Sequence, residues 1–347
     1  MLLQHLHLND FRGGSGIQLD ELRPVNLVVG TNNAGKSSVL EAASLLLRPH
    51  DPANWIQTSR HRDESMSVYD GIWGLFPNAT ALRVEEGRPQ VKVLTVSGSI
   101  HGLSRELSAV VTVMPFFPME AQREVIEVLF GLHALVTDGG ENVTHNFHFN
   151  DRASLTVGPA PSHKSYTLTP GAHRSGRVMI EFFSEAVEAG QKQDAVELVR
   201  LFDPQIRSID LSSSLGRVVV RALHEARGVV DLASFGDGLR RAALFGFALR
   251  RASGGVLMID ELEGGVHSGL LGKVLRALVL GARQADVQIL ATTHSLEALD
   301  ALVDATADAP SDLAVYHLRR AEAGQAEALR FDGDRVRRLR ASGLDLR

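Results

Sequence analysis

The feature that most constrains the fold of this chain is a glycine-rich segment between a short apolar stretch and a helical one. Val25 to Val29 has the composition of a buried strand, and Lys36 to Leu47 has helical spacing that ends at Arg48-Pro49. Between them, Gly30 to Ser37 matches the pattern G-x-x-x-x-G-K-[ST] in full. A strand, a glycine-rich turn and a helix in this order predict a loop whose successive N–H groups point at one phosphate.

This loop predicts a site for a nucleoside triphosphate and its metal ion. Lys36 is expected to reach the β- and γ-phosphates, and the Ser37 hydroxyl is expected to ligate Mg²⁺. A chance glycine-rich turn is the alternative, and the flanking strand and helix argue against it. The expected phosphate-binding residues are those of the loop and the first helical turn: Asn32, Asn33, Ala34, Gly35, Lys36, Ser37 and Ser38.

A second group of polar residues follows an apolar strand near the carboxyl end of the chain. Val256 to Ile259 is apolar and runs directly into Asp260 and Glu261. Such a strand places both acids at the carboxyl edge of a sheet, where ligands bind in open α/β folds. Asp260 is expected at the Mg²⁺ ion, and Glu261 is expected to orient and deprotonate the attacking water. Taken alone, the pair would be an ordinary strand end with solvated acids.

Two further segments fit the same site. The strand Val287 to Thr292 leads to His294, which is expected to donate a hydrogen bond to the γ-phosphate or to the lytic water. Gly236, Asp237 and Gly238 form a turn that opens a helix, so their N–H groups are expected to bind an anion. Taken alone, His294 would be a helix-start residue and the turn a plain helix cap. Two anion-binding turns suggest one nucleotide that contacts both, or two chains that share nucleotides.

These four segments, in this order, resemble the core of the ABC-type ATPases, within the branch that contains SMC, RecF and OLD proteins. Gly30–Ser37 resembles the Walker A motif, Gly236–Arg241 the signature, Val256–Glu261 the Walker B motif, and His294 the switch histidine. The segment Leu6–Arg12 is similar to the start of this branch, where the basic residue, here Arg12, approaches the nucleotide. The resemblance covers both ends of the chain and is weak over residues 116–200.

The resemblance implies the fold, the cofactors and the assembly. The expected fold is α/β, a P-loop NTPase with an ABC-type ATPase core: an antiparallel β lobe, a parallel sheet covered by helices, and a loop-rich and helical insertion. The expected cofactors are ATP and Mg²⁺. Two chains would pair head to tail as a homodimer or within a higher homo-oligomer, each ATP lying between the Walker A of one chain and the signature of the other.

The sequence differs from the usual ABC-type motifs at several positions. Gly236 stands where the signature usually has a serine, and Asp237 adds a charge that Arg240 or Arg241 is expected to offset. No glutamine of the Q-loop type is identifiable, with Gln57 and Gln90 as equal candidates. The stretch after His294 is too short for the nuclease domain of OLD proteins. A separate effector, a nuclease or a toxin, is therefore expected.

The rest of the sequence predicts three zones, 1–115, 116–230 and 231–347, of which the outer two form the ATPase head. Residues 120–130 and 185–200 have helical spacing, and residues 137–176 are expected to be loop-rich with short strands. In the last zone apolar strands alternate with helices, which predicts a parallel sheet. His145, His148, His163 and His173 lack metal-ligand spacing and are expected at the surface.

Composition limits the location and the partners. The chain has no cysteine, no signal-peptide pattern and no apolar run long enough to cross a bilayer, so a cytoplasmic protein without a membrane role is expected. The net charge of −5 gives no general argument for nucleic acid.

Three functions remain open. The first is an ATPase that acts as a conformational switch for a separate effector, and the resemblance suggests a setting in antiphage defence. The second is an ATP-gated scaffold with negligible turnover that sequesters a nuclease or a toxin. The third is a RecF-like repair ATPase that binds DNA through Arg319-Arg320 and Arg335–Arg340, for which a solvated helix face is the simpler interpretation.

Overall fold

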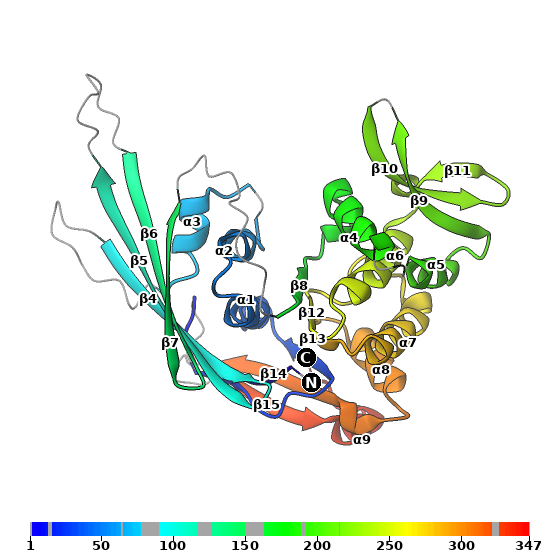
Figure 1. Cartoon of the computed structure of the whole chain (residues 1–347). Helices are drawn as coiled ribbons and strands as arrows, with labels where there is room; N and C mark the ends of the chain where they lie inside the picture. Colours follow the sequence, from blue (N-terminus) through cyan, green and yellow to red (C-terminus); the bar gives the residue numbers. More distant parts are fainter. Residues whose placement is uncertain are drawn as a thin grey trace.

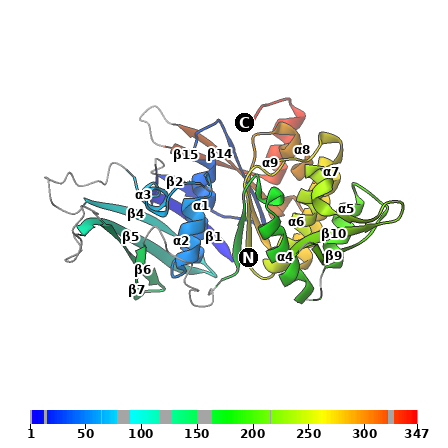
Figure 2. The same cartoon turned by 90° about the horizontal axis from the view of Figure 1, so that it is seen from above.

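A computed structural model describes residues 2–12, 16–63, 65–77, 90–116, 127–149, 163–188, 190, 192–214, 216–320 and 326–346. A largely parallel sheet runs through the middle of the molecule, with a different layer on each face (Figure 1). Helix α1 and an antiparallel sheet lie on one side, and helices α4 to α8 lie on the other (Figure 2). The expected combination of an antiparallel lobe with a helix-covered parallel sheet is confirmed.

The antiparallel sheet has the order β2-β1-β4-β5-β6-β7. Strand β1 alternates as its sequence predicts, because Leu6 and Leu8 are fully buried while His5 and His7 are partly exposed. The strands predicted at 91–96 and 107–113 are confirmed within β4 and β5. The bounds are β1 Leu3–Asp10, β2 Ile17–Leu19, β4 Gln90–Ile100, β5 Leu103–Phe116, β6 Glu127–Asp138 and β7 Glu141–Phe149.

The central sheet has the order β15-β14-β3-β13-β12-β8, and only the β14–β15 pair is antiparallel. Its strands are apolar throughout because both faces are covered. In β12, Leu257 and Ile259 pack into the core under α6 and α7, whereas Val256 and Met258 pack into the core around α1. The bounds are β3 Val25–Gly30, β8 Ser165–Leu168, β12 Val256–Ile259, β13 Gln288–Thr292, β14 Leu313–Arg320 and β15 Ala326–Asp332.

Helices cover both faces of the central sheet, and a small antiparallel sheet, β11-β10-β9, lies beyond α4 and α5 (Figure 1). The helices predicted after the P-loop and in the last zone are confirmed. Among the described helices, none is long and apolar enough to cross a membrane. The helices are α1 Lys36–Leu47, α2 Pro52–Ser59, α3 Val68–Trp73, α4 Gly176–Glu188, α5 Gln193–Arg200, α6 Asp237–Arg251, α7 Ser268–Gln284, α8 Leu296–Ala305 and α9 Gly333–Ala341; the strands of the small sheet are β9 Ile206–Ser214, β10 Arg217–His224 and β11 Gly228–Asp231.

The middle of the chain differs most from the sequence-based expectation. The helix predicted over 120–130 is wrong for residues 127–130, which begin β6, and its remaining part lies outside the described residues. The helix predicted over 185–200 is two helices, α4 and α5. The segment 137–176, expected to be loop-rich with short strands, contains the strands β7 and β8, and β8 joins the central sheet, which the sequence did not indicate. Strand β7 is an edge strand rich in polar residues, so it shows little apolar alternation.

These strands also bear on the expected division into zones. The boundary after residue 115 falls within β5, and the boundary after residue 230 falls within β11. Residues 116–230 therefore contribute strands to all three sheets. The surface position expected for His173 is wrong, since its side chain is 3% exposed and packs beside the start of α6. The division into three zones therefore stays a prediction.

Candidate nucleotide-binding site

The predicted phosphate-binding loop connects β3 to α1 with a backbone that requires glycine. Gly30 and Gly35 have φ angles of 143° and 100°, and Asn33 has a φ of 63°. A Cβ atom added to Gly30 would lie 2.4 Å from the Leu318 carbonyl oxygen of the neighbouring strand. Gly35 caps α1 without a side-chain hydrogen bond, so the N–H groups of the first helical turn face the loop uncapped. Asn32 and Asn33 are exposed at the loop surface.

The Lys36 ammonium group lies inside this loop. Its Nζ atom donates to the Gly30 carbonyl oxygen at 2.6 Å and to the Thr31 carbonyl oxygen at 2.8 Å. Burial lowers the pKa of Lys36, and the charges of Asp260, Glu261 and Glu263 act against that shift. The ammonium group is therefore held at the middle of the loop, within the field of the acids that follow β12.

Asp260 is the point at which the predicted metal-binding residues meet. Its Oδ2 atom accepts a hydrogen bond from Ser37 Oγ at 3.0 Å, and its Oδ1 atom accepts one from Thr292 Oγ1 at 2.5 Å. Burial raises the pKa of Asp260, but the hydrogen bond and charge of His61 and the hydroxyl donors outweigh it, and the pKa falls to about 2. The group is a carboxylate at neutral pH. A carboxylate and a hydroxyl at this separation suit a hard cation such as Mg²⁺.

His61 completes this cluster and was not anticipated from the sequence. Its Nε2 atom lies 2.9 Å from Asp260 Oδ2, and its side chain is only 4% exposed. His61 follows α2. Gln57, one of the two glutamines considered for the Q-loop, is exposed on that helix. Gln90, the other candidate, begins β4. No spacing pattern surrounds His61, so only the fold reveals its contact with Asp260.

Glu261 occupies a turn that other residues hold in place. Its φ angle is 48°, a conformation that non-glycine residues seldom adopt, and its N–H donates to Thr292 Oγ1 at 3.0 Å. Arg241, which is fully buried, donates to the carbonyl oxygens of Asp260 at 2.9 Å and Glu261 at 2.7 Å. Burial lowers the pKa of Arg241 to about 10. Of the two arginines considered as partners of Asp237, Arg241 instead binds the backbone of the Asp260–Glu261 turn.

His294 follows the neighbouring strand β13, and its position is fixed by Glu263. The His294 N–H donates to Glu263 Oε1 at 3.0 Å, and the Thr293 hydroxyl donates to Glu263 Oε2 at 2.7 Å. The side chain of His294 is exposed. Strands β3, β13 and β12 are neighbours and parallel, so the P-loop, His294 and the Asp260–Glu261 pair all follow carboxyl ends at one edge of the sheet.

The predicted signature turn opens α6 on the opposite face of the central sheet from α1. Gly236 is the N-cap of α6, is exposed and makes no side-chain cap. Asp237 is 2.5 Å from Arg174 and 3.5 Å from both Arg240 and His173. The hydrogen bond from Arg174 lowers the pKa of Asp237. Arg240 therefore offsets this charge as expected, with Arg174 as a second partner that the sequence did not indicate.

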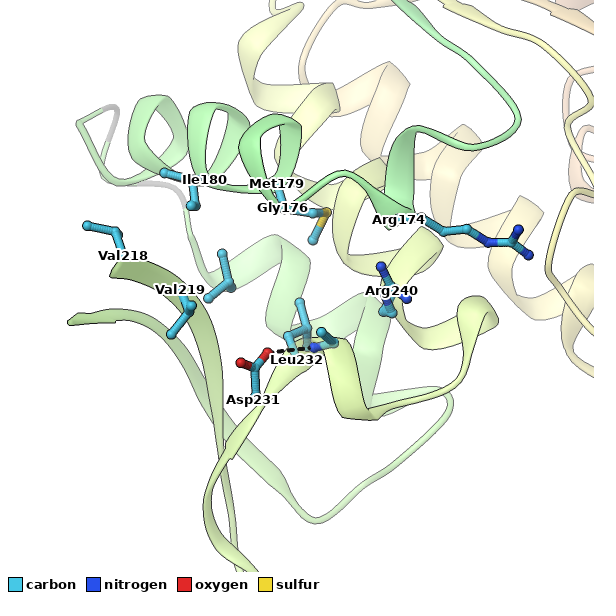
Figure 3. Close-up of a pocket in the computed structure, with 11 residues that line it drawn as sticks. Arg174, Gly176, Met179, Ile180, Val218, Val219, Asp231, Leu232 and Arg240 are labelled. Carbon is cyan, nitrogen blue, oxygen red and sulfur yellow. Dashed lines mark hydrogen bonds between the residues drawn. The ribbon is translucent and has the colours of Figure 1, made fainter. Parts of the chain in front are cut away.

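A cavity of about 190 Å³ lies beside this turn, between α4, β10 and the start of α6 (Figure 3). Its walls are mainly apolar, with Met179, Ile180 and Val219 among them, and both Arg174 and Arg240 reach it. The cavity adjoins the signature turn and contains no residue of the P-loop. The candidate nucleotide site is therefore the open strand edge, and the cavity is a separate feature.

Arg12 lies against α1 and not in the loop itself. Its Nε atom is 2.5 Å from Glu41 Oε2, and the Arg62 Nε atom is 2.9 Å from Glu41 Oε1. Arg62 also donates to Ser38 Oγ at 2.9 Å. The buried Glu41 thus holds two guanidinium groups next to the first turn of α1. Arg62 is a further basic residue at this end of the site that sequence analysis missed.

The chain is similar to several known proteins. The family model described as "AAA domain, putative AbiEii toxin, Type IV TA system" matches residues 112–300, a range that includes the signature turn, Asp260, Glu261 and His294. An ATP/GTP phosphatase of Helicobacter pylori is 20% identical over 342 residues, covering 87% of each chain. An uncharacterized protein of Methanocaldococcus jannaschii is 41% identical over 46 residues, which is 13% of this chain and 21% of that protein.

Among solved structures, the chain resembles the Smc head bound to the C-winged helix domain of ScpA. The TM-score is 0.53 at 10% sequence identity, and the match covers 96% of this chain and 98% of that one. At this identity the match concerns the fold alone.

Proposed function

We propose that this chain is a dimeric ATP switch. It belongs to the family described as "AAA domain, putative AbiEii toxin, Type IV TA system", and it is an ATP-hydrolysing enzyme of this type. The likeness to the Smc head confirms, at the level of fold, the resemblance to the SMC branch of the ABC-type ATPases. In our proposal, Mg²⁺-dependent hydrolysis takes place between two chains that pair head to tail.

The observation that carries the proposal is the meeting of Ser37, His61 and Asp260 at one carboxylate oxygen, beside the loop that holds Lys36. The N–H groups from Asn32 to Ser38 would bind the β- and γ-phosphates, and Lys36 would exchange its two carbonyl acceptors for phosphate oxygens. Ser37 and Asp260 would hold Mg²⁺. When bound, Mg²⁺ neutralises charge on the phosphates.

Hydrolysis in this proposal depends on Glu261 and His294. A water molecule attacks the γ-phosphorus, Glu261 accepts the proton of that water, and the bond to the ADP oxygen breaks. His294 donates a hydrogen bond to the γ-phosphate or to the water. Arg241 and Thr292 act as positioning residues, because they bind the backbone on either side of the Glu261 side chain.

The signature turn supports the dimer. Gly236, Asp237 and Gly238 open α6, which covers the other face of the sheet from α1, and Gly236 is exposed. The uncapped N–H groups of this turn are available to the γ-phosphate of an ATP molecule bound to a second chain. Arg174 and Arg240 would limit the repulsion between Asp237 and that phosphate. A two-fold arrangement uses both turns of both chains.

We further propose that the dimer acts on a separate effector, a nuclease or a toxin, in antiphage defence. The family description, which names toxins and toxin–antitoxin systems, supports this setting. The DNA-binding alternative has less support, because Arg319 is paired with Glu327 and Arg340 with Asp300. The scaffold alternative differs from the switch in turnover.

The proposal is tested with Glu261→Gln. We expect hydrolysis to fall by at least about 100-fold, since the base that accepts the proton is lost, while titration calorimetry shows ATP binding unchanged. Light scattering after size exclusion should find ATP-bound dimers of the variant. Glu297→Gln, at an exposed position on α8, is the matched control and should keep wild-type turnover. Wild-type turnover in Glu261→Gln would remove Glu261 from this role, and negligible wild-type turnover with ATP-controlled assembly would favour the scaffold.

A further inference from the structure

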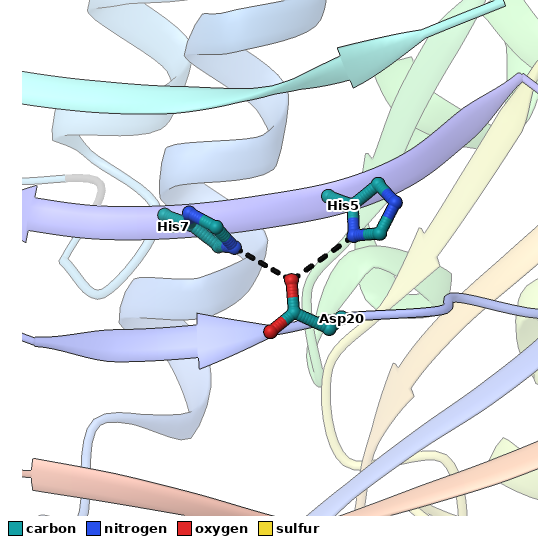
Figure 4. Close-up of side chains that lie close together, drawn as sticks. All are labelled: His5, His7 and Asp20. Atoms are coloured by element: carbon teal, nitrogen blue, oxygen red, sulfur yellow. Dashed lines mark hydrogen bonds and ion pairs between the residues drawn. The ribbon is translucent and has the colours of Figure 1, made fainter. Parts of the chain in front are cut away.

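Two histidines on β1 and one aspartate after β2 converge at one point, and none of the three is among the residues assigned to the nucleotide (Figure 4). His5 Nδ1 lies 3.0 Å and His7 Nε2 lies 2.7 Å from the same oxygen, Asp20 Oδ1. His5 and His7 are two residues apart on one strand, so they share a face, while Leu6 between them is fully buried. Asp20 follows β2, which pairs with β1 at the sheet edge.

We propose that His5, His7 and Asp20 form a binding site for one divalent transition-metal ion, with Zn²⁺ as the best-suited ion. Two imidazole nitrogens and a carboxylate oxygen are ligands that such ions accept, and they leave further positions for water. Ligands about 2.0–2.2 Å from a zinc ion, at angles near 90–110°, are separated from one another by about 3 Å. The two nitrogen–oxygen separations already have this size, and all three ligand atoms lie within 4.8 Å of one another.

The backbone around Asp20 is held by hydrogen bonds from neighbouring elements. The Asp20 carbonyl oxygen accepts a hydrogen bond from the buried Tyr316 hydroxyl at 2.7 Å. The next turn is held by the Leu22 N–H, which donates to the Gln4 carbonyl oxygen at 2.9 Å. Fixed backbone around a ligand reduces the cost of ordering it.

The solvent exposure of the three side chains also favours a metal site. The side chains of His5, His7 and Asp20 are 42%, 31% and 51% exposed, so an ion can reach them from solvent. Within the described part of the chain, this is the one group of three histidine, aspartate or glutamate side chains whose ligand atoms lie this close together. A bound ion would tie β1 to the segment that leads into β3 and the P-loop, so it should stabilise the fold.

The test is a Co²⁺ and Zn²⁺ titration of the full-length chain after chelator treatment, without nucleotide. We expect visible d–d absorption from one Co²⁺ per chain, displaced by Zn²⁺, and a higher melting temperature with Zn²⁺. His7→Gln and Asp20→Asn should each weaken binding by at least about 10-fold, because each removes one of three ligands. His133→Gln, at an exposed histidine that contacts Asn146, is the matched control and should bind as the wild type does.

Asp260→Asn separates this site from the nucleotide site, and it should leave Co²⁺ binding intact. The proposal is overturned if the wild type shows no saturable binding below millimolar Co²⁺, or if His7→Gln binds as tightly as the wild type. Loss of binding in Asp260→Asn alone would also overturn it, by placing the ion at the P-loop. Melting curves without metal verify that the variants are folded, and none of these outcomes depends on ATP turnover.

Discussion

At the scale of single residues, Asp260 organises the site. Its two oxygens contact Ser37, His61 and Thr292, which belong to three different parts of the chain. Lys36, Ser37, Asp260 and Glu261 could be predicted because a local pattern surrounds each of them. His61 could not, because it lies 199 residues from Asp260 in sequence and only the fold joins the two. The same holds for Arg241, whose partners are backbone carbonyl oxygens that leave no pattern in the sequence.

Replacement of His61 should therefore affect the metal ion more than the nucleotide. We expect His61→Ala to raise the Mg²⁺ concentration needed for half-maximal hydrolysis by about 10–100-fold, since groups that orient a ligand commonly have effects of this size. ATP binding measured without Mg²⁺ should change little. His61→Gln keeps a donor near Asp260 and should recover much of the loss.

Gln57→Ala, at an exposed position of α2, serves as the control for this experiment. An unchanged Mg²⁺ dependence in His61→Ala would show that the contact with Asp260 serves only packing.

At the scale of elements, helix α6 connects the signature turn to the core. Its glycine at position 246 allows α5 to approach closely, because a Cβ added there would lie 2.4 Å from the Ala195 Cα atom. Long periodic helices such as α6 and α7, and the apolar strands of the central sheet, could be predicted from their spacing. The start of β6 was mistaken for a helix because of its helical spacing. Short strands were expected in 137–176, but they could not be placed in a sheet, because β7 is polar and β8 has only four residues, whose partner strand lies far along the chain.

Two glycine substitutions in helices should have opposite effects on stability. Gly246→Ala should lower the free energy of unfolding by about 1–3 kcal/mol, because the α5–α6 contact has no room for a methyl group. Gly272→Ala, on the exposed side of α7 with nothing within 4 Å of an added Cβ, should raise it by about 0.5–1 kcal/mol through helix propensity. Urea unfolding measures both. An unchanged or raised free energy of unfolding in Gly246→Ala would mean that the α5–α6 packing is not as close as described.

At the scale of the whole molecule, the central sheet separates the two anion-binding turns. The P-loop joins β3 to α1 on one side, and the signature turn opens α6 on the other. The sequence indicated two such turns and left open whether one nucleotide or two chains join them. Because the turns belong to opposite layers, we favour the two-chain arrangement. The head-to-tail pairing of two chains could be predicted only through the resemblance, because contacts between molecules leave no periodic pattern in one sequence.

The most direct test of this shared site mixes two variants that each lack one half of it. Lys36→Ala removes the ammonium group from the P-loop. Gly236→Glu places a carboxylate at the signature turn, where an added Cβ meets no atom within 4 Å, so the monomer should fold normally. Gly238 is unsuitable because its Cβ would lie 2.8 Å from Phe202.

Each variant alone should be inactive, and an equal mixture should regain about one quarter of wild-type hydrolysis. Half of the randomly formed dimers then contain both variants, and each of these has one of its two sites intact. A mixture as inactive as its components, or a Gly236→Glu variant as active as the wild type, would contradict the head-to-tail site.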